Sequence, residues 1–420
     1  MNILLKSATI IDPDSPYHLK IQDVLIENGI ISKIGNTLKS NGNTKVIQLE
    51  NLHLSQGWFD SNVQFGEPGF EERETLENGL DTAAKSGFTD IGLQADLIPV
   101  TDTHSQISYL KSKTKNYATS VHPFGALTKL NQQKELAEIF DMHKAGATAF
   151  YDYKKPIDNA YLLKLALQYA QGFGGLVCSF PNDGNLSLDG VMHEGETSTK
   201  LGLTGIPVLA ETLRIARDLQ ILEYTGGKLH IPTISCEESV VLIAKAKDKG
   251  LDVTCSISVN NLALTDEALF DFDSDKKVLP PLRNEANRQA MVKAVKKGLI
   301  DLVTSDHCPM DIEHKKMEFD HAAFGSIGLE SSFGILNRLF GTEKTIQLLT
   351  AGKNRFGIKN SVILPGNEAK LSLFNPEGNS TFTTENILSS SKNSALINEK
   401  IKGKTYGIFS NNQLIIKLLN

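Results

Sequence analysis

Residues 60–66 read Asp-Ser-Asn-Val-Gln-Phe-Gly and lie just after an apolar stretch of the chain. Two carboxamides, Asn62 and Gln64, stand two residues apart in this segment. A hydrolase that activates water with a metal ion holds that ion with imidazole or carboxylate groups. Carboxamides are neutral and are weak donors to a metal, so the segment is a poor place for such an ion.

The histidines and cysteines of the chain do not form another obvious cluster. None of the ten histidines shows the His-x-His or His-x-x-x-His spacing of a metal site. We expect His193 in an ordinary surface loop, His230 in the core, and His314 and His321 in solvent, which leaves His307 as the best outside candidate for a ligand. The four cysteines form no CxxC pair, which predicts small buried or loop residues rather than a disulfide framework or a thiolate zinc site.

Several short motifs along nearly the whole chain resemble those of dihydroorotase, the cyclic amidohydrolase of pyrimidine synthesis. In chain order they are Glu67-Pro68-Gly69-Phe70 with Glu74-Thr75, Gly87-Phe88-Thr89, Val191-Met192 with Glu194-Gly195, Gly205-Ile206-Pro207 with Ala210-Glu211, Pro280-Pro281-Leu282-Arg283, Asp306-His307-Cys308-Pro309, and Gly328-Leu329-Glu330. The resemblance implies an α/β fold, a (β/α)8 barrel of the amidohydrolase type whose site lies where strands end and loops begin.

The resemblance also places the positions of the family's working side chains on particular residues of this chain. Its ligand positions hold, in order, Asn62, Gln64, Tyr153, Phe180, Thr233 and Asp306. A one-residue ambiguity leaves Asp152 as the alternative to Tyr153 at the bridging position. The positions of the substrate contacts hold Gly66, Asp96 and Leu279, of which glycine offers an anionic substrate neither charge nor a side-chain donor.

Asp306 alone keeps the residue type that the family uses to bind metal and move the proton. Free water has a pKa of about 15.7, against about 7 for water on zinc, so Asp306 without a metal has nothing to deprotonate at neutral pH. We therefore expect a vestigial, hydrogen-bonded carboxylate at the end of a strand, and no metal cofactor.

The composition is that of a large protein with a substantial core. The chain has 420 residues, 40% of them hydrophobic, and a net charge of −6, which makes nucleic acid and anionic membranes poor partners. The N-terminus lacks the pattern of a secretory signal, and no stretch approaches the roughly 18 apolar residues of a membrane span. These features predict a cytoplasmic protein.

The chain divides into three blocks. Residues 1–54 have short alternating apolar runs and an Asn28-Gly29 turn, which predict a β-meander, and residues 361–420 have similar runs. Both ends are expected to build one small β-sandwich domain. Residues 55–360 alternate short apolar strands with helical stretches, as in a barrel of parallel βα units. Predicted strands are 147–150, 175–178, 228–231, 253–256 and 300–304, and predicted helices are 207–224, 239–249 and 285–297.

Three functional readings follow. In the first, the chain is a catalytically inactive dihydroorotase-like subunit, a scaffold or regulator, and the resemblance suggests aspartate carbamoyltransferase as partner and a homodimer as assembly. In the second, it is an active dihydroorotase, or a related hydrolase of a cyclic amide or a ureide, with an unconventional zinc site around Asp152, Asp306 and His307. In the third, the emptied cavity binds a neutral ligand through Asn62, Gln64, Asn182, Asn260 and Asn261.

Overall fold

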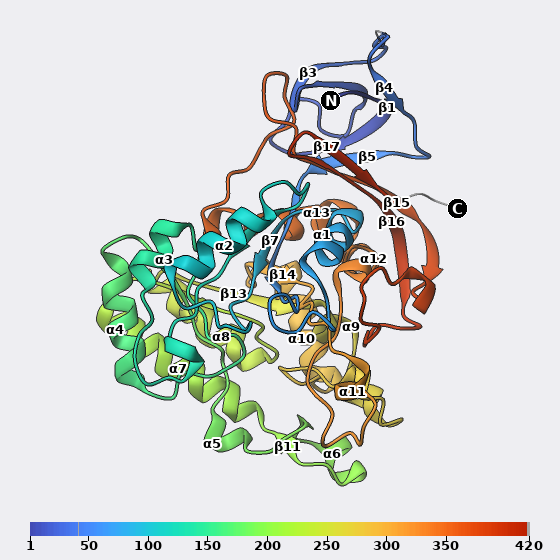
Figure 1. Cartoon of the computed structure of the whole chain (residues 1–420). Helices are drawn as coiled ribbons and strands as arrows, with labels where there is room; N and C mark the ends of the chain where they lie inside the picture. The colour runs from blue at the N-terminus through green and yellow to red at the C-terminus, as the bar shows by residue number, and fades with distance from the viewer. Residues whose placement is uncertain (41, 418–420) are drawn as a thin grey trace.

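The computed structural model describes residues 1–40 and 42–417. Strands from both ends of the chain form one eight-stranded sheet, seen in the upper part of Figure 1. Its strands are β1 (Asn2–Ile11), β2 (Ile21–Glu27), β3 (Ile30–Gly35), β4 (Lys45–Ile47), β5 (His53–Gln56), β15 (Leu371–Thr381), β16 (Lys400–Ser410) and β17 (Gln413–Ile416). The order is β17-β16-β15-β5-β1-β2-β3, and β4 also pairs with β1.

The predicted meander is correct for β1, β2 and β3, which are antiparallel neighbours. Asn28 and Gly29 join β2 to β3 with φ angles of 51° and 82°, the left-handed values that a tight hairpin turn requires. The prediction is wrong for β4 and β5, because both run parallel to β1. Parallel pairing needs a crossover rather than a hairpin, and the chain between β3 and β5 supplies it.

The central part of the chain closes into a barrel of parallel strands. Its strands are β6 (Trp58–Val63), β7 (Phe88–Leu93), β8 (Ser120–Pro123), β9 (Leu176–Cys178), β12 (Lys228–Ile231), β13 (Val253–Ser258) and β14 (Leu302–Thr304). Single-residue bridges at Phe150 and at His307 complete the ring. Phe150 pairs with Gly125 after β8 and with Val177 in β9, and His307 after β14 pairs with Val63 in β6.

The predicted strand at 147–150 therefore occupies the place of a barrel strand without the length of one. The amide of Phe150 donates to the carbonyl of Leu176 at 2.9 Å, and its carbonyl accepts from Cys178 at 2.9 Å. On the other side, Thr148 donates to Pro123 at 3.1 Å. Pairing reaches both neighbours but is confined to a few residues, so only single bridges form.

Helices surround this barrel (Figure 1). The longer ones are α1 (Leu76–Lys85), α2 (His104–Thr114), α3 (Ile139–Ala145), α4 (Ala160–Gln171), α7 (Val208–Thr225), α8 (Glu237–Asp248), α10 (Glu285–Lys296), α12 (Leu329–Phe340) and α13 (Thr342–Ala351). Short elements in the loops are α5 (Gly184–Ser187), β10 (Met192–His193), α6 (Glu196–Leu201), β11 (Gly205–Ile206), α9 (Val259–Ala263) and α11 (Ile312–Lys315). The predicted helices match α7, α8 and α10 to within two residues at each end.

Trp58, the single tryptophan of the chain, joins the barrel to the sheet. Its ring stacks on Phe333 of α12 at a centroid distance of 5.0 Å and packs against Phe374 of β15 at 5.5 Å. The indole Nε1 donates to Ser55 Oγ of β5 at 2.8 Å, so its polar edge is satisfied. Among the described residues, no helix combines the length and the apolar character needed to cross a bilayer.

Candidate functional site

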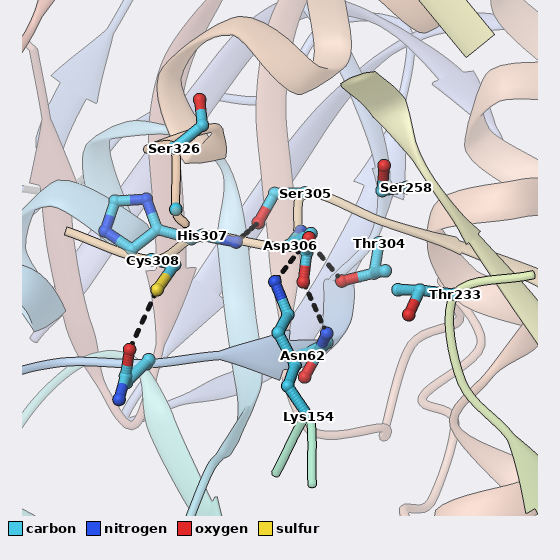
Figure 2. A network of polar contacts seen from close by, with 12 residues as sticks. Asn62, Lys154, Thr233, Ser258, Thr304, Ser305, Asp306, His307, Cys308 and Ser326 are labelled. Atoms are coloured by element: carbon cyan, nitrogen blue, oxygen red, sulfur yellow. Dashed lines mark hydrogen bonds and ion pairs between the residues drawn. The ribbon is translucent and has the colours of Figure 1, made fainter. Parts of the chain in front are cut away.

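Asp306 follows β14 at the end of the barrel where strands run into loops. Its φ of 54° lies in the left-handed region, and its amide donates to Thr304 Oγ1 at 3.1 Å. The residue is only 2% exposed, so its carboxylate needs partners inside the protein. Figure 2 shows the two side chains that supply them, from Asn62 and Lys154.

Lys154 provides the cation that this carboxylate binds. Its Nζ lies 2.9 Å from Asp306 Oδ2, while Asn62 Nδ2 donates to Oδ1 at 2.7 Å. The ammonium is also 5.3 Å from the centre of the Tyr153 ring, and the amide of Lys154 donates to the Tyr151 hydroxyl at 3.1 Å. A side chain of the protein itself thus neutralises the one acidic group retained at the family's ligand positions.

Burial dominates the electrostatics of this ion pair. Desolvation raises the pKa of Asp306 to about 6, the negative charge of Asp60 adds to the rise, and Lys154 opposes it. Asp60 itself accepts hydrogen bonds from the backbone amide of Asn62 at 3.0 Å, the backbone amide of Ser305 at 2.8 Å and the Thr304 hydroxyl. It therefore ties the end of β6 to the end of β14 and fixes the distance between Asn62 and Asp306.

Gln64 has its carboxamide committed to other partners. Its Oε1 accepts from Cys308 Sγ at 2.9 Å, and its Nε2 donates to the carbonyl of Asp96 at 3.3 Å and to Asp96 Oδ2 at 3.4 Å. The Asp96 carboxylate is at the rim, 4.0 Å from the ammonium of Lys155. Asp96 thus places a negative charge at a position where the family contacts an anionic substrate.

Apolar side chains fill the space next to the ion pair. Tyr153 and Phe180, both at expected ligand positions, are 4% and 1% exposed. We call the cluster around them the aromatic plug; it comprises Phe59, Phe124, Ala149, Tyr151, Tyr153, Leu176, Cys178, Phe180, Leu302, Cys308, Phe356 and Ile358. Leu279, at another substrate position, and Met310 pack against the plug from the side. Neither Tyr153 nor Phe180 is free to approach an ion or a polar substrate.

Backbone atoms, rather than side chains, fill the space around Gly66. Its amide donates to the carbonyl of Glu74 at 2.8 Å, and its carbonyl accepts from Phe70 at 2.8 Å. A Cβ built at Gly66 would lie 1.8 Å from the Phe70 carbonyl oxygen. The loop therefore has no room for any side chain at the position where the family carries a substrate-binding arginine.

Two of the amides expected to line a polar pocket, those of Asn182 and Asn261, are held by other partners. Asn182 donates to Ser187 Oγ at 3.0 Å, and Asn261 donates to the carbonyl of Pro281 at 2.9 Å, so both brace loops. Within the described part of the chain, several buried atoms near the mouth lack a hydrogen-bond partner, namely Asn62 Oδ1, Tyr153 Oη, Thr233 Oγ1 and both amide atoms of Asn260. Thr233 is fully buried with a φ of 52°.

The alternative site of Asp152, Asp306 and His307 does not assemble. Asp152 accepts from the amides of Leu127 at 2.8 Å and Thr128 at 2.9 Å, so it caps the loop after β8 instead. His307 uses Nδ1 to accept from the amide of Gly328 at 3.2 Å, and burial lowers its pKa to about 4. Among the residues described, no three His, Cys, Asp or Glu side chains are placed to hold a metal.

His193 is a further correction to the sequence analysis, because it is buried rather than in an exposed loop. Its Nδ1 lies 3.2 Å from Arg283 Nη1, and burial together with that guanidinium lowers its pKa to about 4. Arg283 also donates to Ser235 Oγ at 2.9 Å and pairs with Glu211 at 3.4 Å. Retained motif residues such as Glu211 and Arg283 thus cross-link loops in this chain.

The other predictions for isolated residues are confirmed: His230 is buried, with its Nδ1 2.9 Å from Thr254 Oγ1, and all four cysteines are free and buried.

The residues present do not fit the metal centre that the fold implies. The expected ligand positions hold two amides, a phenol, a phenyl ring, a hydroxyl and a single carboxylate. That carboxylate already binds an ammonium. A catalytic zinc generally takes three protein ligands of the imidazole, thiolate or carboxylate type, and one carboxylate cannot replace them.

Comparison with known proteins agrees with the barrel and its motifs. The fold is that of the amidohydrolases: L-hydantoinase (dihydropyrimidinase) from Arthrobacter aurescens superposes with a TM-score of 0.86 at 19% identity, covering 99% of this chain and 96% of that one. Dihydropyrimidinase from Brevibacillus agri gives a TM-score of 0.82 at 21% identity, covering 99% and 95%. These likenesses establish the class of fold.

Sequence comparison narrows the class to one family. The Dihydro-orotase-like family model matches residues 53–239. Dihydroorotase of Pelotomaculum thermopropionicum is 34% identical over 99% of this chain and 99% of its own length. Dihydroorotase of Desulforapulum autotrophicum is 34% identical over 96% of both. The chain belongs to the dihydroorotase family.

Sequence reasoning missed Lys154 as a member of the site. The residue stands directly after Tyr153 in the segment Phe150-Tyr151-Asp152-Tyr153-Lys154. A basic residue so close to a position where acidic ligands are expected was the available signal. Its reach across the barrel to Asp306 is a tertiary contact between residues 152 positions apart, and no local pattern predicts it.

The ion pair makes a double-mutant cycle informative. Removing one partner of a buried pair leaves the other charge uncompensated, so Asp306→Asn and Lys154→Met should each lower the free energy of unfolding by about 3 kcal/mol. The double variant should lose less than the sum of the two. Lys155→Met is the control, because its side chain is 48% exposed and 4.0 Å from Asp96. Urea unfolding followed by circular dichroism measures all five proteins, and strict additivity would show that the pair is not coupled.

The raised pKa of Asp306 predicts a pH dependence of stability. Because the folded state holds this proton up to about pH 6, against an ordinary value of 3.8, the group stabilises the fold at low pH. That contribution is lost as the pH rises through about 6. We expect the free energy of unfolding of the wild type, relative to Asp306→Asn, to fall between about pH 4 and 6 and then to level. Parallel pH profiles for the two proteins would contradict the assignment.

Proposed function

We propose that this chain is a catalytically silent member of the dihydroorotase family that serves as a structural or regulatory subunit in pyrimidine biosynthesis. The observation that carries the proposal is the buried contact between Lys154 Nζ and Asp306 Oδ2 at 2.9 Å. The ammonium group of Lys154 binds Asp306, the carboxylate with which the family would bind a metal ion and take a proton from the water on that metal. The buried ion pair leaves no general base poised for hydrolysis.

Two physical arguments favour a complete absence of hydrolase activity over weak activity. First, a carboxylate whose charge is paired with Lys154 cannot by itself deprotonate free water, whose pKa is about 15.7. Second, Tyr153 and Phe180 are buried in an apolar cluster, and the loop at Gly66 leaves no room for a side chain that could hold an anionic substrate. The alternative, an active hydrolase of a cyclic amide or a ureide with zinc at Asp152, Asp306 and His307, gains no support, because these side chains serve three separate contacts.

A scaffold needs a stably folded barrel and does not need an accessible active site. The strand ends are braced by Asp60 and the loops by Arg283, both of them buried. Helices surround the barrel (Figure 1). By analogy with inactive dihydroorotase-like chains of some bacteria, we propose cytoplasmic aspartate carbamoyltransferase as the partner.

The first test measures metal and turnover together. Protein purified without chelator should contain far less than one zinc per chain by plasma mass spectrometry, and should not hydrolyse dihydroorotate. Lys154→Ala is the matched variant: it frees Asp306, yet one carboxylate still lacks companions, so it should also stay without metal. Stoichiometric zinc in the wild type, with turnover that is lost in Asp306→Ala, would reverse the proposal.

The second test addresses the partner. Co-expression with the aspartate carbamoyltransferase of the same organism should give a joint peak in size-exclusion chromatography with light scattering, with a mass equal to a whole-number complex. An active dihydroorotase relative, mixed with the same carbamoyltransferase, is the control for family-wide association. Separate elution of the two proteins across a range of concentrations would remove carbamoyltransferase as the partner, without affecting the prediction of silence.

A further inference from the structure

A cavity of about 860 Å³ lies between loops that come from distant parts of the chain. We call it the loop cavity; it is lined by Glu72, Asp275, residues 310–316 and residues 390–393. Small-molecule sites in proteins generally have volumes of about 300–1,000 Å³. The described residues that line the cavity include none of the family's ligand or substrate positions. The loop cavity is therefore separate from the site at the barrel mouth, and it is large enough for a small ligand.

Lys315 brings a positive charge into the wall of this cavity. The residue is only 3% exposed, and its Nζ donates to the carbonyls of Ala323 and Gly325, both at 3.0 Å. Within residues 1–40 and 42–417 the ammonium group forms no ion pair with a carboxylate. An ammonium group has three N–H donors, so one donor is still available to a ligand. Burial lowers the pKa of Lys315 to about 8, which shows that its positive charge is poorly compensated.

Asp275 brings a negative charge to the same cavity. It is half-buried, and in the part of the chain that the structure describes its carboxylate accepts no hydrogen bond and forms no ion pair. Burial raises the pKa of Asp275, and Lys315 is the strongest of the charges that oppose this rise. Asp275 is in turn the strongest of the charges that raise the pKa of Lys315. The two groups therefore attract each other without being in contact.

The other charged side chains of the lining are either paired or balanced in sign. Asp311 is engaged by Arg73 at 3.5 Å and by His314 at 2.7 Å. The remaining four are exposed to solvent, two of them acidic and two basic: Glu72, Glu313, Lys316 and Lys392. A lining whose charges balance has no strong net field to attract a simple anion or a simple cation. It suits a molecule that is neutral overall.

Two opposite charges that have lost hydration without touching each other are costly to the fold. A ligand with a single charge would satisfy one of them and leave the other unpaired. A ligand that carries both an ammonium and a carboxylate group can donate to Asp275 and accept from Lys315, which gives two charge-assisted hydrogen bonds. An α-amino acid at neutral pH is the simplest molecule of this kind. Met310 and Ile312, in the same lining, offer its side chain apolar contacts.

We propose that the loop cavity binds a zwitterionic α-amino acid, with the ammonium group of the ligand on Asp275 and its carboxylate on Lys315. Binding would join the loop that follows β14 to the loop that carries Asp275, which gives the chain a means to respond to an amino acid. These contacts do not involve Lys154 or Asp306, so the proposal does not depend on the absence of hydrolase activity.

Ligand binding to the wild type is measured first. The melting temperature is recorded with each of the standard L-amino acids at millimolar concentration, because a molecule that binds only the folded state raises it. Calorimetric titration then compares the most stabilising amino acid with its N-acetyl derivative, which lacks the ammonium group, and with its amide, which lacks the carboxylate. Each derivative should bind roughly tenfold more weakly or worse, because it leaves one charge of the cavity unpaired.

Two variants assign each end of the ligand to its residue. Asp275→Asn should weaken binding of the amino acid roughly tenfold and remove the difference between it and the N-acetyl derivative. Lys315→Met should in the same way remove the difference between the amino acid and its amide. Asp275→Asn breaks no hydrogen bond of the side chain, so it carries the test if Lys315→Met does not fold.

Matched controls come from the same loop and from a second buried lysine. Asp271→Asn changes a carboxylate that lies outside the lining and is paired with Lys276 at 2.7 Å. Lys277→Met removes an ammonium group that is also buried and also donates to two carbonyls, those of Phe319 at 2.8 Å and Asp320 at 3.0 Å, but does not line the cavity. Both variants should bind the amino acid as the wild type does, and circular dichroism shows that each is folded.

Three outcomes would overturn the proposal. The first is that no amino acid raises the melting temperature or releases heat on titration. The second is that the N-acetyl derivative or the amide binds as tightly as the amino acid, which would assign the cavity to a ligand with a single charge. The third is that Asp275→Asn leaves the affinity unchanged, which would place the amino acid elsewhere on the protein.

Discussion

The buried ion pair between Lys154 and Asp306 is the interaction on which the rest of the account depends. Taking a carboxylate and an ammonium out of water costs several kcal/mol per ion, and the pair repays this only with good geometry and further hydrogen bonds. Here Asn62 supplies the hydrogen bond to the second carboxylate oxygen at 2.7 Å, and Asp60 fixes Asn62 by accepting from its amide at 3.0 Å. In amidohydrolases this end of the barrel carries the chemistry. Here it is organised around the Lys154–Asp306 ion pair, in which the protein itself neutralises the carboxylate.

The neighbouring substitutions are consistent with that arrangement. Tyr153 and Phe180 are buried apolar groups where the family has metal ligands, and the backbone around Gly66 leaves no room for a side chain that could hold an anionic substrate. The ion pair between Arg283 and Glu211 joins a loop to α7, and this contact needs no reaction at the site. A barrel can keep its fold whatever side chains its site carries, since the strands that form the core are separate from the loops that form the site.

Much of this could be predicted from the sequence, and the failures have physical reasons. The barrel, a small β domain shared by both ends of the chain and the helices α7, α8 and α10 follow from periodicity and turn residues, and the motifs located Asn62, Gln64 and Asp306 at one site. The two ends were expected to form a β-sandwich, whereas their strands form one eight-stranded sheet. The parallel pairing of β4 and β5 with β1 could not be predicted, because strand direction depends on crossovers rather than on local pattern. Burial of His193 depends on Arg283, which is 90 residues away. The contact of Lys154 with Asp306 was missed for the same reason, because it joins residues 152 positions apart and no local pattern predicts it.

The most direct test of the central claim is a high-resolution crystal structure of protein crystallised with Zn²⁺ and collected at the zinc absorption edge. The account predicts density for Lys154 Nζ in hydrogen-bond contact with Asp306 Oδ2 and no anomalous peak between residues 62, 64 and 306. An anomalous peak at that place, with Lys154 displaced from Asp306, would contradict it.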